Sequence, residues 1–107
     1  MVWPEEGMSA KDEKVRALFW HLWNLQGGYC AVCGENLRAT GARPQIAHRL
    51  PQNQVNLRKY GEAVIHHELN TRLVCSLECN QKVSRRNYPL WEARHVAKIR
   101  KALKEET

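Results

Sequence analysis

Two close pairs of cysteines, far apart along the chain, constrain its fold more than any other feature. Cys30 and Cys33 are separated by two residues, and Cys75 and Cys79 are separated by three. A gap this short lets one turn of backbone present both sulfurs to a single ion, and Zn²⁺ binds four thiolates in a tetrahedron. Because four thiolates leave no open position for water, we expect one structural zinc ion held by these four cysteines.

The alternative interpretations of the four cysteines are disulfides, buried free thiols or a redox pair. The N-terminal segment MVWPEEGMSA lacks the apolar run of a secretory signal, and no segment approaches the roughly 18 apolar residues of a membrane span. We therefore expect a cytoplasmic protein with no membrane association, in which thiols stay reduced. A thioredoxin-like redox site needs only one pair, in a strand–helix context that the sequence does not show.

Length and charge narrow the class of protein. A chain of 107 residues fits one domain, which we place at residues 9–107 after a flexible tail at residues 1–8. Charged residues make up 26% of the chain, so the apolar core is thin and a structural metal would supplement it. The formal net charge of +6, from 17 Lys and Arg against 11 Asp and Glu, favours polyanionic partners, nucleic acid first.

Hydrophobic periodicity predicts a long helix at each end of the domain. Apolar residues recur at helical spacing over residues 10–26, and Gly27-Gly28 supplies the stop. A second helix is predicted over residues 89–105, because Pro89 suits a first helical turn and the apolar residues again share one face.

Shorter elements are expected between these two helices. Residues 45–50 predict a short strand that Pro51 stops, and residues 72–74 predict a second strand. A helix led by a cysteine should cover about residues 75–84. Residues 52–63 are polar and predict no element.

An ordered series of residues accompanies the cysteine pairs: a histidine on a strand, then an asparagine, then a helix led by a cysteine. The pieces are Cys30-Ala-Val-Cys33, Ile46-Ala-His48-Arg-Leu-Pro51, His67-Glu-Leu-Asn70 and Leu73-Val-Cys75-Ser-Leu-Glu-Cys79-Asn80. In this order they resemble the motif of zinc-containing HNH endonucleases, over about half the chain, from Tyr29 to Lys82. The resemblance implies an α+β fold: a zinc-stabilised ββα-metal domain (HNH or His-Me finger) flanked by N- and C-terminal helices.

The resemblance also implies an activity, the metal-dependent cleavage or nicking of DNA phosphodiesters. His48 would be the general base that activates water, Asn70 would hold the connecting loop so that His48 is oriented, and Asn80 would ligate a catalytic Mg²⁺ or Mn²⁺. Imidazole titrates near neutral pH, a cation neutralises charge that develops on phosphate, and an amide oxygen suits these hard ions. Small stand-alone HNH proteins resemble phage nucleases, so we expect a bacterial or phage-infected host cytoplasm.

One position departs from the HNH pattern. The residue before the catalytic histidine is normally an Asp, Glu or His that ligates the metal, and here it is Ala47. Three explanations remain open. His66 or His67 folds back to replace the ligand; the cation is held by Asn80, water and phosphate; or the site has decayed. His67 also has a structural interpretation, as the cap of a turn.

Arginines near the site predict contacts to phosphate. Arg49 follows the candidate base directly, and Arg85 and Arg86 follow the predicted cysteine-led helix. Such contacts give affinity that is independent of base sequence and sensitive to salt, and we expect double-stranded DNA as the partner. The basic residues of the last helix are instead expected on a solvated face.

Two other functions fit the same residues. The zinc-held fold could bind DNA without cleaving it, as Ala47 favours, or it could be a zinc ribbon that docks a protein partner through its tryptophan-bearing helices. The first predicts salt-sensitive DNA affinity with no divalent-dependent activity. The second predicts DNA affinity no greater than the net charge gives.

Overall fold

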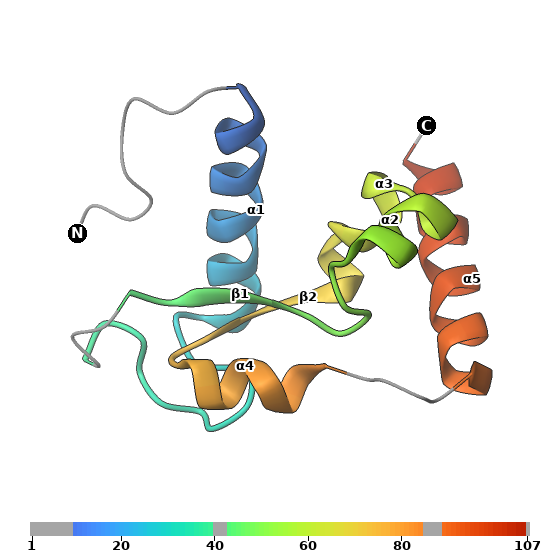
Figure 1. The fold of residues 1–107 in the computed structure, drawn as a ribbon. Coiled ribbons are helices and arrows are strands. Elements are labelled where there is room, and N and C mark those ends of the chain that lie inside the picture. The colour runs from blue at the N-terminus through green and yellow to red at the C-terminus, as the bar shows by residue number, and fades with distance from the viewer. Residues whose placement is uncertain (1–9, 40–42, 85–88, 107) are drawn as a thin grey trace.

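Two long helices lie near the two ends of the described part of the chain, as the periodicity predicts. The computed structural model describes residues 10–39, 43–84 and 89–106. Helix α1 covers Ala10–Gln26 and helix α5 covers Pro89–Glu105, each with 17 residues. Both predicted helices are therefore confirmed. Figure 1 shows α1 standing against the sheet and α5 lying beside the short helices α2 and α3.

A two-stranded antiparallel sheet lies between the long helices. Strand β1 covers Gln45–His48 and strand β2 covers Thr71–Val74, with Gln45 opposite Val74 and His48 opposite Thr71. The predicted strand at residues 45–50 is thus two residues too long. Helix α4, Leu77–Val83, follows β2 and packs against both strands, as expected for the cysteine-led helix.

The connection between the strands folds into helices that the polar sequence of residues 52–63 did not predict. Helix α2 covers Gln54–Tyr60, helix α3 covers Glu62–Ile65, and the short 3₁₀-helix η1 covers Glu68–Asn70. The side chain of Asn53 accepts a hydrogen bond from the backbone N–H of Asn56 and so caps α2. Gly61, at φ 88°, makes the sharp turn into α3 that a side chain would strain.

The buried apolar residues form two clusters, and the sheet joins them. The first cluster lies among α1, the sheet and the zinc-ligand candidates, and contains Phe19, Leu22, Trp23, Cys30, Leu37, Ala47, Leu73, Val74 and Cys79. The second lies under α3 and α5 and contains Leu50, Val64, Ile65, Val96 and Ile99. The chain passes from the first cluster to the second between Ala47 and Leu50, so His48 lies at their junction.

The molecule is a small mixed α+β domain. Within the described residues, no helix combines the length and the apolar composition that crossing a bilayer requires.

Candidate functional site

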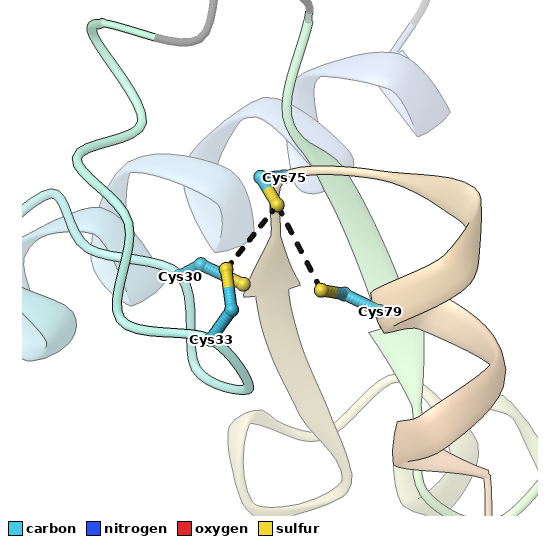
Figure 2. A group of neighbouring side chains, drawn as sticks. All are labelled: Cys30, Cys33, Cys75 and Cys79. Atoms are coloured by element: carbon cyan, nitrogen blue, oxygen red, sulfur yellow. Dashed lines mark hydrogen bonds between the residues drawn. The ribbon is translucent and has the colours of Figure 1, made fainter.

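The four cysteines come together at one end of the sheet, as their spacing predicts. Figure 2 shows their sulfurs converging from the knuckle after α1, the end of β2 and the start of α4. All four Sγ atoms lie within 4.8 Å of one another, with 3.5 Å between Cys33 and Cys75 and 3.8 Å between Cys75 and Cys79. Bonds of about 2.3 Å to a tetrahedral Zn²⁺ place sulfurs about 3.8 Å apart. The cluster could therefore hold a zinc ion.

Backbone hydrogen bonds hold the first pair in its knuckle. The N–H of Cys30 donates to the carbonyl of Glu35 at 2.9 Å, and the N–H of Gly34 donates to the carbonyl of Cys30 at 3.0 Å. The N–H of Ala31 donates to the carbonyl of Leu73 at 3.0 Å, which fastens the knuckle to β2. These bonds place the first two sulfurs beside the strand that leads to the second pair.

The second pair is set by the start of α4. The Ser76 hydroxyl accepts a hydrogen bond from the N–H of Cys79 at 3.2 Å and so caps the helix. Cys75 then lies just before the cap and Cys79 in the first turn. A three-residue gap therefore brings both sulfurs to the same side of the helix start.

The pKa values of two thiols in this cluster are shifted in opposite directions. Burial raises the pKa of Cys30, but hydrogen bonds from the N–H groups of Cys33 and Val32 outweigh it and bring the pKa to about 6. The Ser76 hydroxyl lowers the pKa of Cys75, yet hydrogen bonding with the Cys33 thiol and burial raise it to about 12. A bound divalent ion would stabilise all four thiolates together.

A second group of polar side chains lines a cavity beside the far end of β1. The cavity has a volume of about 630 Å³ and is bounded by Lys14, Val15, Leu18, Ile46, His48, Gln52, Glu62, Ala63 and His66. His48 thus meets residues of α1 and α3 that no sequence motif connects with it. The sequence analysis did not connect Glu62 with His66. Their four-residue spacing, which places them on one face of a helical turn, is the signal that could have done so.

His48 and His66 face each other across this cavity. Nε2 of His48 lies 3.2 Å from Nδ1 of His66, and the ring planes are inclined at 75°. Burial, and then the electrostatic effect of the neighbouring His66, lower the pKa of His48 to about 4. His48 is therefore neutral at neutral pH, with one of the two facing nitrogens donating the proton of the pair.

Asn70 fixes the backbone that leads away from His48. Its side chain is fully buried, and its Oδ1 accepts a hydrogen bond from the N–H of Leu50 at 2.8 Å. Its Nδ2 donates to the carbonyls of Leu50 and Ile65, and its own carbonyl accepts from the N–H of Arg49 at 2.8 Å. The two residues after His48 are thereby held in one position.

The other two candidate ligands of a catalytic cation do not line the cavity of His48. Nδ2 of Asn80 donates to Oε1 of Gln45 at 3.0 Å, and Gln45 precedes His48 by three strand residues, about 10 Å. Nδ1 of His67 accepts from the N–H of Leu69, while Nε2 lies 2.9 Å from the Glu106 carboxylate. His67 therefore caps η1, as its structural interpretation predicts, and both of its ring nitrogens have hydrogen-bond partners.

Ala47 points into the protein core. Successive strand residues face opposite sides of a sheet, so Ala47 and His48 point in opposite directions. Ala47 is fully buried in the first cluster, together with Cys79. A ligand at position 47 would therefore face the core beneath α4, away from the cavity that His48 lines.

The candidate phosphate-binding arginines are only partly described. Arg49 lies over the ring of Trp91 in α5, with its guanidinium carbon 5.1 Å from the ring centroid. Trp91 in turn stacks on His95 at 4.6 Å. Arg85 and Arg86 lie outside the described residues.

Within residues 10–39, 43–84 and 89–106, only the four cysteines bring three or more His, Cys, Asp or Glu ligand atoms together. Comparisons of the chain with models of protein families, with curated proteins and with solved structures find no match.

Proposed function

We propose that the chain is an HNH-type endonuclease that cleaves or nicks DNA phosphodiesters, with His48 as the general base. The observation that carries the proposal is the placement of His48. Its imidazole lines an open cavity, has His66 as a hydrogen-bond partner, and is followed by backbone that Asn70 holds in place. A base that is accessible and fixed in position is what proton removal from an attacking water requires.

The arrangement of the elements supports a ββα-metal core. Strands β1 and β2 are antiparallel, α4 follows β2 directly, and α4 packs against both strands. The candidate base stands at the end of β1 and the asparagine stands just before β2, in the order that the motif implies. The cysteine cluster would lock the start of α4 onto this pair of strands.

The cavity also offers an oxygen ligand for a hard cation. Glu62 lines the same cavity as His48, and carboxylate oxygens suit Mg²⁺ and Mn²⁺. Such an ion would be held by Glu62, water and a phosphate oxygen of the substrate, and would neutralise charge on the phosphate during attack. Glu62 would thus take the role for which position 47 is unsuited.

Charge favours DNA as the substrate. The formal net charge of +6 attracts a polyanion, and Arg49 lies next to the candidate base. We expect affinity for double-stranded DNA that falls steeply as salt is raised, since phosphate contacts release counterions.

The test is nicking of supercoiled plasmid by the zinc-loaded chain, with Mg²⁺, with Mn²⁺ and with EDTA. The proposal requires nicking that depends on an added divalent ion and disappears with EDTA. A Glu62→Gln variant removes the carboxylate but keeps the shape of the side chain, and should require higher Mg²⁺ for the same rate. Activity that is indifferent to divalent ions would contradict the proposed mechanism.

A second candidate function is DNA binding without cleavage. It is favoured by the burial of Ala47 and by the pairing of Asn80 with Gln45, because neither expected ligand position lines the cavity of the candidate base. It predicts that the well-folded, zinc-loaded chain retards plasmid in a salt-sensitive manner and leaves it supercoiled with every divalent ion tested.

A further inference from the structure

We infer that His48 and His66 form a second metal site, which takes a transition-metal ion such as Zn²⁺ and is separate from the four cysteines. Zinc in this site would engage both imidazoles and so remove the base. The binding stands on the geometry alone, whereas the inhibition that follows from it rests on the proposed nuclease function.

The separation of the two imidazole nitrogens fits a shared ion. Zinc binds histidine nitrogen at about 2.0–2.1 Å, so two such nitrogens are about 3.3 Å apart on a tetrahedral ion and about 2.9 Å apart at a right angle. Nε2 of His48 and Nδ1 of His66 are 3.2 Å apart, within this range. A metal ion would take the place of the proton that the pair shares, with each ring turning so that its nitrogen points at the ion.

Glu62 can complete the ligand set. It lies four residues before His66, one turn of helix away, and lines the same cavity. Its carboxylate would supply an oxygen as the third ligand. Two imidazoles and one carboxylate suit Zn²⁺, while the cavity of about 630 Å³ leaves room for water as the fourth ligand.

The two metal sites are independent of each other. Cys75 follows Val74, which pairs with Gln45 at one end of β1, whereas His48 pairs with Thr71 at the other end. Three strand residues, about 10 Å, separate these ends. The chain should consequently bind two zinc ions in excess zinc, one tightly in thiolates and one more weakly in imidazoles.

Zinc in the second site opposes the proposed reaction. A general base needs a free lone pair on the imidazole, and a zinc ion bound to that nitrogen occupies it. Magnesium prefers oxygen ligands and would leave His48 free. The proposed nuclease would therefore work with Mg²⁺ and lose activity as free Zn²⁺ fills the histidine site.

The experiment is a zinc titration of the full chain without DNA. The protein is first loaded with one equivalent of zinc, and further Zn²⁺ is added in a calorimeter; Co²⁺, whose visible spectrum separates imidazole from thiolate ligands, is used in parallel. The variants are His48→Gln and His66→Gln, and the control is His21→Gln, an exposed histidine of α1 paired with Glu68 at 2.6 Å. Circular dichroism establishes that each variant is folded.

The result expected is a second equivalent of zinc in the wild type and in His21→Gln. Both cavity variants should bind it at least about tenfold more weakly, since even loss of an outer partner costs a metal site that much. A single equivalent in the wild type, or equal second-site affinity in His66→Gln, would overturn the inference. If the chain binds the second zinc ion but never nicks plasmid, the result would support the histidine metal site and contradict only the proposed nuclease activity.

Discussion

Nε2 of His95, in α5, lies 2.9 Å from Oδ1 of Asn70 in the interior of the domain. Because Oδ1 is only an acceptor, His95 donates this bond and Leu50 donates the other. The C-terminal helix is thereby connected to the backbone that leaves His48. Residues outside the motif thus help to position the candidate base.

The burial of His95 beside Asn70 makes the free energy of unfolding depend on pH. Burial, followed by the positive charges of Arg49, Arg72, Lys98 and His67, lowers the pKa of His95 to about 4. An unfolded histidine has a pKa of about 6.5, so between pH 6.5 and 4 the unfolded chain binds the proton first. The contribution of neutral His95 is complete above pH 6.5 and is lost as pH falls toward 4.

The comparison with His95→Gln isolates this effect, since glutamine can still donate to Asn70. Between pH 7.5 and pH 5 the wild type should lose about 2 kcal/mol more unfolding free energy than the variant. Urea unfolding of both zinc-loaded proteins at the two pH values measures it, and zinc release at low pH affects both equally. Identical losses would show that His95 is not the titrating group.

Asn70→Ala should be among the most destabilising substitutions in the chain. It leaves the N–H and carbonyl of Leu50 and the carbonyl of Ile65 without their partners inside the domain. Each unpaired buried group costs about 1–3 kcal/mol, so a total loss of about 3 kcal/mol or more is expected. Urea unfolding measures it, with the capping variant Asn53→Ala as a control that should cost about 1 kcal/mol. A loss no larger than that of the control would contradict the role given to Asn70.

The variant Asn80→Ala tests whether Asn80 ligates the catalytic cation, as the HNH motif implies, or only pairs with Gln45, as the structure shows. The HNH pattern makes Asn80 a ligand of the catalytic cation, whereas the structure pairs it with Gln45, about 10 Å along β1 from His48. We expect this variant to nick plasmid near the wild-type rate at saturating Mg²⁺. A folded Asn80→Ala protein that no longer nicks would place the cation at α4 and exclude Glu62 as its principal ligand.

Zinc removal should unfold the first apolar cluster. Cys30 and Cys79 are buried within it beside Trp23, so the metal would join three segments of chain around the same residues. We expect Cys79→Ser, or chelation of the wild type, to abolish cooperative unfolding monitored by tryptophan fluorescence. Val32→Ser, an exposed change in the same knuckle, should keep the transition. A metal-free chain that unfolds at an unchanged midpoint would rule out a structural role.

The elements that the sequence predicts correctly are those with local signals. Periodicity and end signals locate both long helices, and cysteine spacing locates the cluster. Helix α2, within residues 52–63, was not predicted because it buries no residue, and so its sequence has no apolar stripe.

The pairing of His48 with His66 could not be predicted from spacing. It arises because α3 folds back onto the end of β1, a tertiary contact that leaves no periodic trace. The alternation of side chains along a strand does place Ala47 and His48 on opposite faces, and this could have been inferred once the strand was assigned.

Plasmid nicking by His48→Ala tests whether His48 removes a proton from the attacking water. We expect zinc-loaded His48→Ala to nick at least about 100-fold more slowly than wild type in Mg²⁺. His21→Ala, the matched exposed histidine of α1, should nick at the wild-type rate. Equal nicking by wild type and His48→Ala, purified in parallel and both folded, would show that His48 is not the general base.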